Sequence, residues 1–510
     1  MKDKLGFVFI GLIFFYWLSV VIYYSFGFRF TPIGDYQQHN AETYNILAGN
    51  FLGDAAYKGE HAWYPFLEQT LVAIFHLVTR IPVQTIYVSY PFIISGPVVL
   101  IFIFFVQKLF KSTSFTLISL FALLFVIPWT THQLTLNLHP VVLALGMLPL
   151  ALYLFYRAVL VDKFTYWILA GVGIAVLIYT QTIAALTFCG GVTLYLLFNK
   201  KIWRGFMVMV FTSFVLVSPY LLPLMISYRL TPQNTFGTFY FSYYSFLDAL
   251  LYGLGPIRFV NLFFIDSGLV VFFLSKKIHH KIILAVFFFG LVVEYSGIAR
   301  YYNLLPSFVP IFVPQDFQLF NHEIAIFPFA AGALFWFHHM GLFLGKKRSL
   351  LWLFTGTIIV SYVVLMVPQL NQRATDRREL LANTYYDSEW LRVTDWIWQN
   401  TKIDDVFLVH QDSAYTFING MTGRKVVANE NVHSNTFVNQ QLRGFDNMAL
   451  YQSANLTDFK KLAGKYDVAY VVVSPYEQNL PGYSLEKFVS DSFFALEYSS
   501  DNVKIFRLNW

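Results

Sequence analysis

Asp35 and His39 are the first residues in this sequence whose types and spacing could do chemistry. They stand four positions apart, shortly after the first long apolar run, so a helix over this stretch would place both side chains on one face. A carboxylate beside a cleft at a membrane surface can serve as a general base. Asp is also a favoured N-cap residue, so the structural alternative is that Asp35 caps a helix over residues 36–48. The two roles are compatible.

Histidines supply a second kind of candidate. His61 and His139 lie in polar segments between apolar runs and are predicted to line the substrate cavity. Asp35 with His39, His61 or His139 could also bind a divalent metal. No tight ligand spacing points to such a site, so the sequence makes no cofactor certain and leaves a divalent metal open.

Two acids fall within or near apolar runs. Asp266 stands inside NLFFIDSGLVVFFL, where an ionisable group is costly and is by default a functional candidate for a substrate cavity or a proton path. Glu294 is near the outer end of its run, and we expect it to snorkel to the surface. The segment VPQDFQLFNHEIAIFP adds Asp316, His322 and Glu323, either as substrate-cavity groups or as a hydrated loop entering the next span.

The elements that position these residues are predicted from composition. The chain has 510 residues, of which 57% are hydrophobic and only 13% charged, against roughly 25% charged in a typical soluble protein. This high hydrophobic and low charged content excludes intrinsic disorder. The single cysteine, Cys189, excludes a disulfide within the chain.

Apolar runs long enough to cross about 30 Å of hydrocarbon fill the first 370 residues. The sequence predicts about eleven transmembrane helices, near residues 5–27, 85–107, 114–129, 139–157, 165–181, 183–198, 205–227, 259–275, 281–297, 324–344 and 349–368. We expect the first to remain as a helix, because it is long for a signal peptide and lacks an obvious small-residue cleavage site.

Charge placement predicts the orientation. With the N-terminus in the cytoplasm, the inner segments hold 15 Lys and Arg residues and the outer segments up to residue 368 hold 6, as the positive-inside rule requires. The net charge of +6 is therefore largely a topology signal, and it does not point to nucleic acid. The sequence predicts a multi-pass protein of the plasma membrane with an extracytoplasmic C-terminus.

A soluble domain follows the spans. Residues 1–370 form the predicted transmembrane domain, and polar composition sets in over residues 371–510. There, a helix over 388–400 precedes strands that alternate with helices, and a hairpin ends the chain. This pattern predicts a small α/β domain outside the membrane.

The order of these features resembles the polytopic glycosyltransferases of the GT-C class. The match consists of Asp35-x-x-x-His39 after the first span, Tyr64-Pro65 before an external amphipathic helix, YTQT between paired spans, the outer loop over 298–322, and the segments TGRKVVANENVH and KYDVAYVVVSP in the soluble domain. The fold class is thus an α-helical polytopic membrane protein with a C-terminal α/β domain. The resemblance covers nearly the whole chain.

The resemblance implies transfer of a hexose or pentose from a polyprenyl-phosphate donor to a glycan, lipid or protein acceptor on the outer face. Asp35 matches the position of the catalytic carboxylate, with His39 beside it. The leaving phosphate needs cationic stabilisation, and the best candidates are Arg258 and Arg300, each next to a span; interfacial anchoring is the alternative role for both.

The sequence departs from the GT-C pattern at one point, and two other functions are compatible with it. The second outer loop, WTTHQLTLNLHP, has His132 and His139 but lacks the acid that many members of the class carry there, which argues against a metal held between two acids. A transporter or flippase is the main rival, although no internal repeat supports it. A noncatalytic scaffold displaying the C-terminal domain is the other.

Overall fold

The structure is a computed structural model that describes most of the chain. The described residues are 2–31, 34–127, 130, 134, 140–231, 233, 258–301, 304–305, 314–344, 357, 362, 364, 367–368, 370–372, 374–382, 388–429, 434–479, 482–483 and 486–510. They form two compact units, and each is composed of segments that are distant in the sequence.

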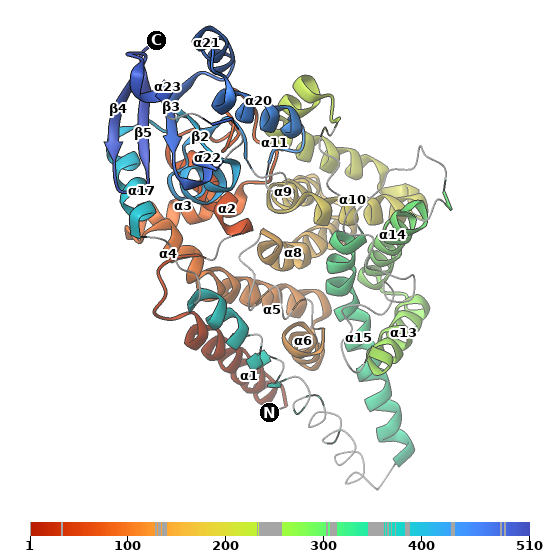
Figure 1. Cartoon of the computed structure of the whole chain (residues 1–510). Helices are drawn as coiled ribbons and strands as arrows, with labels where there is room; N and C mark the ends of the chain where they lie inside the picture. The colour runs from red at the N-terminus through yellow and green to blue at the C-terminus, as the bar shows by residue number, and fades with distance from the viewer. Residues whose placement is uncertain are drawn as a thin grey trace. The chain divides into compact units, whose positions relative to one another are not determined.

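The first unit is helical and comprises residues 1–27, 89–217 and 237–379 (Figure 1). Apolar segments inside a bilayer adopt helices because every backbone polar group must be satisfied within the segment. Its elements are α1 (Lys2–Ser25), η1 (Pro91–Ser95), α5 (Gly96–Phe110), α6 (Thr113–Phe121), η2 (Ala122–Val126), α8 (Pro140–Val161), α9 (Phe164–Thr180), α10 (Thr182–Leu197), η3 (Lys200–Ile202), most of α11 (Trp203–Tyr228), α13 (Arg258–Leu274), α14 (Ile278–Tyr301) and α15 (Pro314–Leu344).

Ten of the eleven predicted spans coincide with these helices. Within the described part of the chain, six helices are long and apolar enough to cross a membrane, and four more of the predicted spans are apolar helices of 10–17 residues. The prediction over 349–368 falls mostly on residues outside the description, so the number of spans stays a prediction. The predicted break at YTQT is confirmed, because α9 ends at Thr180 and α10 begins at Thr182.

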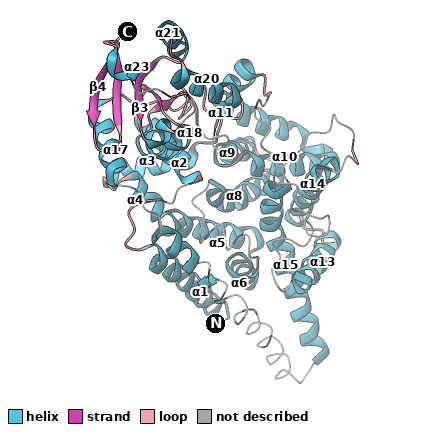
Figure 2. Ribbon diagram, in the orientation of Figure 1, coloured by secondary structure: helices cyan, strands magenta, loops and turns pink. Residues whose placement is uncertain are grey.

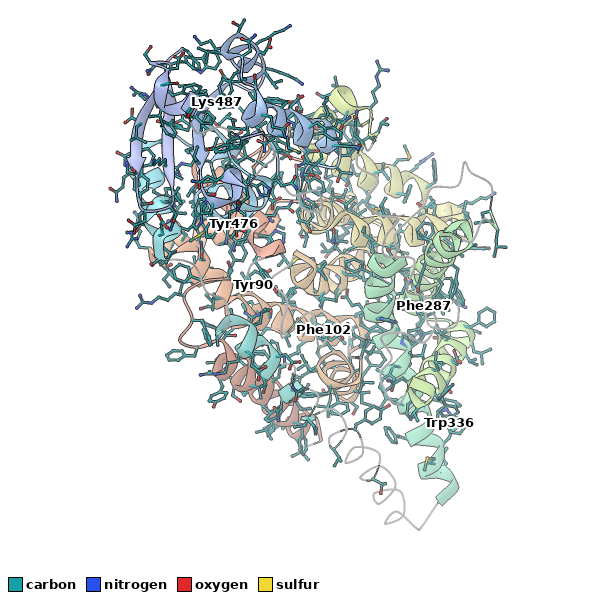
Figure 3. All side chains as sticks on the ribbon, viewed as in Figure 1. Tyr90, Phe102, Phe287, Trp336, Tyr476 and Lys487 are labelled. Carbon is teal, nitrogen blue, oxygen red and sulfur yellow. The ribbon has the colours of Figure 1, made fainter. Side chains whose placement is uncertain are left out.

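Small residues and stacked rings pack the helices of this unit. A Cβ atom on Gly268 of α13 would collide with the carbonyl of Pro328, and one on Gly332 of α15 with that of Phe264. Such close approach of backbones is typical of helix pairs inside a membrane. Phe102, which is fully buried and labelled in Figure 3, stacks on Phe327 with ring centroids 6.2 Å apart.

The second unit comprises residues 28–88, 218–236 and 380–510. Residues 28–88, the segment predicted to lie outside the membrane, contribute α2 (Asp35–Leu47), α3 (Leu67–Thr79) and α4 (Val83–Val88), and the end of α11 also belongs here. The helices expected from residue 36 and after Pro65 are therefore both confirmed, as α2 and α3, and the external position of the second stays a prediction.

The C-terminal residues of this unit fold around a five-stranded mixed sheet in the order β2-β1-β3-β5-β4 (Figure 2). Strands β2 (Lys425–Val426), β1 (Val406–Leu408) and β3 (Val468–Val473) are parallel, and β5 (Lys504–Leu508) runs antiparallel to β3 and to β4 (Phe494–Ser499). The helices are α17 (Ser388–Asn400), α18 (Gln411–Ser413), η5 (Ala414–Asn419), α19 (Gly420–Thr422), α20 (Gln440–Gln452), α21 (Leu456–Lys465), α22 (Pro475–Gln478) and α23 (Glu486–Ser490).

Helices cover both faces of the sheet. Phe407 and Ile505 point to one face and pack with Ile397 of α17, whereas Leu408 and Phe506 point to the other and pack with helices α20, α21 and α23. This alternation along each strand is what a sheet buried on both faces requires. The predicted α/β domain is confirmed. The boundary at residues 370/371 stays a prediction, and the structure adds the first outer segment to the same compact unit.

Candidate functional site

The predicted catalytic carboxylate is the first residue of α2. Gly34 occupies the N-cap position with φ of 131°, in the region that favours glycine, and Asp35 follows it. The alternative that Asp35 itself is the N-cap is therefore wrong by one position. The side chain of Asp35 lies outside the described residues.

His39 is buried next to a second carboxylate. Its Nδ1 atom lies 3.4 Å from Oε2 of Glu42 and 3.0 Å from Nε2 of Gln69. The Gln69 amide also donates to Oε2 of Glu42 at 2.6 Å, and the Gln38 amide donates to Oε1 at 2.9 Å. The two amides and the imidazole hold the Glu42 carboxylate in one orientation.

Glu42 is the residue that sequence reasoning missed. It stands seven positions after Asp35 and three after His39, and this spacing places all three on one stripe of a helix. Sequence reasoning singled out Asp35 and His39 in this stretch and gave Glu42 no role. The signal that could have found it is the continuation of the Asp35–His39 spacing by one more turn.

Neighbouring tyrosines fix the position of His39. The hydroxyl of Tyr87 donates to the His39 carbonyl at 3.2 Å and lies 2.9 Å from the Thr43 hydroxyl. The ring of Tyr64, from the predicted Tyr-Pro motif, lies 5.6 Å from the imidazole ring. The motif therefore supplies one wall of the histidine pocket.

A small cavity opens at Glu42. Its volume is ≈ 30 Å³, which is room for about one or two water molecules. Its polar lining includes Gln38, Glu42, Asn45, Asp54 and Asn435, and apolar side chains form much of the rest. The carboxylate and amide groups on one part of the wall can bind water or a hydroxyl group.

Asp54 anchors the loop beside this cavity. Its Oδ1 atom accepts the backbone N–H groups of Ala56 and Tyr57 at 2.7 and 2.8 Å, and Oδ2 accepts the Asn435 amide at 2.8 Å. Burial raises the pKa of Asp54, and the positive charge of Lys425 opposes that shift. Burial lowers the pKa of Lys425 to about 8.

The quoted segment TGRKVV has a structural role in this unit. Gly423 has φ of 72°, and the buried guanidinium of Arg424 donates to the carbonyls of Thr422 at 2.7 Å and Thr401 at 2.9 Å. It also donates to the Ile397 carbonyl at 3.3 Å. Arg424 thus caps the end of α17, whose last carbonyls otherwise lack donors.

His61 lies in the same unit but makes different contacts. Its backbone N–H donates to the Tyr228 hydroxyl at 3.0 Å, and the two rings are 6.0 Å apart. Its carbonyl accepts the Asn435 amide at 3.1 Å. The contacts described for His61 are with Tyr228 and Asn435 rather than with His39, so its predicted place in the substrate cavity stays a prediction.

Asp266 lines a cavity of ≈ 300 Å³ in the first unit, between α13, α14 and α15. Glu294, Asn321 and His322 line it as well, and so does Phe287, which Figure 3 labels. The prediction that Glu294 snorkels is wrong, because its side chain is 3% exposed and accepts the Asn321 amide at 2.6 Å. A neighbouring helix supplies the polar partner that water would otherwise provide.

Glu323 is fully buried in α15 and is not part of the lining of that cavity. Among the described residues, neither of its carboxylate oxygens nor Nδ1 of His322 has a hydrogen-bond partner, although all three atoms are buried. Glu323 therefore stays a candidate on chemical grounds alone.

The predicted arginines stand at helix ends. Arg258 is the first residue of α13 and Arg300 is the next to last of α14. The two helices are antiparallel, because α13 ends at Leu274 and α14 begins at Ile278, so only a short connection joins them. Both arginines therefore stand at one end of the helix pair. Their side chains, and His139, His132 and the side chain of Asp316, lie outside the described residues.

A metal site is not apparent in what the structure describes. Among the described residues, no three His, Cys, Asp or Glu side chains come close enough to hold an ion. The combination of Asp35 with His39 or His139 is not tested by this, because the Asp35 side chain and His139 are outside the description.

Solved structures share the fold over almost the whole chain. ArnT from Cupriavidus metallidurans bound to undecaprenyl phosphate has a TM-score of 0.55 at 11% identity, covering 99% of this chain and 98% of that chain. The archaeal oligosaccharyltransferase AglB from Archaeoglobus fulgidus, in complex with an inhibitory peptide and a dolichol-phosphate, has a TM-score of 0.55 at 11% identity, covering 96% and 71%. The arabinofuranosyltransferase AftD from Mycobacteria has a TM-score of 0.54 at 11% identity, covering 98% of this chain but 40% of its own.

All three are GT-C glycosyltransferases, so the chain has the GT-C fold of a multi-pass membrane protein. The fold expected from the order of sequence features is confirmed. No family model and no curated protein sequence matches the chain.

Proposed function

We propose that this chain is an integral membrane glycosyltransferase that moves a sugar from a polyprenyl-phosphate donor to an acceptor hydroxyl on the outer face of the plasma membrane. The observation that carries the proposal is the fold match to ArnT with undecaprenyl phosphate, which extends over 99% of this chain and 98% of the other. A buried cluster supports it: His39 and Glu42 lie one and two turns beyond Asp35 in α2, and Gln69 of α3 contacts both.

The reaction is a displacement at the anomeric carbon of the donor. The acceptor oxygen forms the new bond to that carbon, the bond from the carbon to the phosphate oxygen breaks, and the polyprenyl phosphate leaves with the electron pair. The proton of the acceptor hydroxyl passes to a carboxylate, for which Asp35 is the predicted group. Glu42, held by Gln38 and Gln69, would orient the acceptor or share the proton.

The leaving phosphate gains charge as the bond breaks, and cationic groups stabilise that charge. Arg258 and Arg300 are proposed for this role because their positions in α13 and α14 stand at the same end of an antiparallel helix pair. The mostly apolar cavity that Leu262, Leu291 and Phe287 help to line lies between the same helices. It would accept part of an apolar carrier chain.

The proposed orientation puts the N-terminus in the cytoplasm and the α/β domain outside. The inner segments carry 15 basic residues against 6 outside, and α2, with Asp35 and His39, then faces the outer side. The acceptor, a glycan, a lipid or a protein, would approach from that side.

The test is Asp35→Asn in the source cells, with polyprenyl-phosphate sugars and glycan products followed by mass spectrometry. We expect product to fall by about a hundredfold or more, because a general base contributes roughly 10²–10⁴ to rate, and the unused lipid-linked donor to accumulate. The control is Asp467→Asn, an identical change at an exposed surface ion pair with Lys58. An unchanged product profile with Asp35→Asn protein still inserted would refute the catalytic role and favour transport or scaffolding.

A further inference from the structure

Helix α20 presents an uncharged apolar face outward. Leu442, Phe445 and Met448 are 47%, 61% and 41% exposed, and their spacing places them along one side of the helix. The other exposed residues of α20 are Gln441, Ala449 and Gln452. A helix that faces water normally carries its charges on the exposed side.

The two charged residues of α20 are held by partners within the unit. Arg443 lies 3.3 Å from Glu60 and over the ring of Tyr57 at 4.2 Å. Asp446 accepts the Lys465 ammonium at 2.6 Å. The outward side is therefore left to Leu442, Phe445 and Met448.

Helix α20 begins at one end of a membrane-spanning helix. Tyr228, the last residue of α11, donates to Glu60 at 2.7 Å, and Glu60 pairs with Arg443 of α20. The ring of Tyr228 stacks on Phe437 at 5.3 Å, and the backbone N–H of Gln233 donates to the Thr436 carbonyl at 2.8 Å.

The end of α11 that contacts Glu60 and Phe437 also exposes apolar residues. Helix α11 is one of the six described helices that are long and apolar enough to span a membrane. Met225 and Ile226 on its last turns are 43% and 75% exposed, and Leu230 just beyond is 47% exposed. Tyr228 among them is typical of the water–lipid boundary, where tyrosine is enriched.

We infer that α20 lies along the surface of the bilayer with Leu442, Phe445 and Met448 inserted among phospholipid headgroups and upper acyl chains. A helix with one apolar face gains stability at this boundary by removing that face from water. Continuity with the lipid-exposed end of α11 selects the bilayer over other partners. Helix α20 would then tie the α/β domain to the membrane surface, a function separate from sugar transfer.

The test is site-specific fluorescence in lipid nanodiscs that each hold one copy of the full chain. In a Cys189→Ser background, Phe445→Cys carries a bimane label, and the bilayer contains phosphatidylcholine with a doxyl group near the headgroup. Ile226→Cys on α11 is the lipid reference, and Asp501→Cys, exposed in the turn between β4 and β5, is the water reference. Met448→Cys is a second reporter on the same face, for use if labelling at 445 disturbs folding.

We expect lipid quenching at 445 and 448 to match that at 226 and to exceed that at 501 by about threefold, because an interfacial helix inserts its apolar face to headgroup depth. Quenching at 445 and 448 equal to that at 501 would overturn the inference. A disulfide between two copies through Cys at 445 in liposomes, without lipid quenching, would assign the face to a second copy and overturn it as well. Neither result bears on the Asp35→Asn assay.

Discussion

The ammonium nitrogen of Lys425, on strand β2, lies 2.6 Å from the amide oxygen of Asn45, on helix α2. The same nitrogen donates to the carbonyls of Asp54 at 2.7 Å and Ala55 at 3.3 Å. One buried lysine of the C-terminal sheet thus holds both the helix that begins at Asp35 and the loop beside the Glu42 cavity. The position of the candidate site depends on this cross-link within the second unit.

Lys425→Met should destabilise the second unit. The change removes the buried ammonium that donates to Asn45, Asp54 and Ala55, and it leaves the Asp54 carboxylate without its counter-charge. Breaking a buried charge pair costs about 3 kcal/mol or more of unfolding free energy. Thermal unfolding of the detergent-purified protein measures it. Lys461→Met, at an exposed position of α21, is the control and should change little.

The free energy of unfolding should rise with pH because of Lys425. Burial lowers its pKa from 10.5 to about 8 in the folded chain, so between these values the unfolded chain binds more protons and stability rises with pH. Relative to pH 8, the lowered pKa of Lys425 adds roughly 3 kcal/mol to the free energy of unfolding above pH 10.5. This stability is lost as the pH falls to about 8.

The measurement is the difference between wild-type and Lys425→Met unfolding curves from pH 7 to 10. Burial also lowers the pKa of Lys487 to about 8, and the difference removes that shared contribution. A difference that does not change with pH would show that Lys425 keeps an ordinary pKa in the folded chain.

Gly423→Ala should destabilise the same region. Gly423 has φ of 72°, and an added Cβ would lie 2.6 Å from Cβ of Tyr44. Left-handed backbone at alanine together with this contact costs about 2 kcal/mol or more. Gly444→Ala in α20 is the matched control, because its Cβ meets only the Gln411 side chain, at a contact distance of 4.0 Å, and it should stabilise by up to about 1 kcal/mol. Equal effects of the two changes on thermal unfolding would contradict the prediction.

Local sequence signals were sufficient for most elements of the C-terminal domain. The prediction of a helix over 388–400 matches α17, and the predicted hairpin matches β4 and β5. These elements have amphipathic or alternating patterns that are visible within a short window. Helix α20 was missed because Leu442, Phe445 and Met448 add apolar positions on its exposed side. Apolar residues in this segment therefore do not recur with the helical period of 3.6 residues.

Contacts between distant segments could not be predicted in this way. Lys425 and Asn45 are 380 positions apart, and neither residue type signals its partner. The Tyr57 hydroxyl likewise donates to Gln440, which is also distant from it in the sequence. From one sequence, only the spacing of residues within one element can be interpreted. The Asp35–His39 spacing lies within one helix and was found. The contacts of the loop beside the Glu42 cavity with the α/β domain join distant segments and were not found.

Glu42→Gln should lower glycosyl transfer by about tenfold to a hundredfold, as loss of a group that orients a reactive residue commonly does. The Glu42 carboxylate accepts from Gln38 and Gln69 and lies 3.4 Å from His39. An amide at this position places an N–H group against one of these donors, so the cluster must rearrange. Because the change removes a charge but little volume, insertion of the protein should be unaffected.

Product formation at several acceptor concentrations, in the assay used for Asp35→Asn, distinguishes two roles for Glu42. If Glu42 binds the acceptor, the apparent KM rises and kcat stays near wild type; if it shares the proton, kcat falls at a constant KM. Asp467→Asn again serves as the surface control. Activity of Glu42→Gln equal to that of the control would exclude Glu42 from the site and leave Asp35 as the only carboxylate of α2 assigned to the reaction.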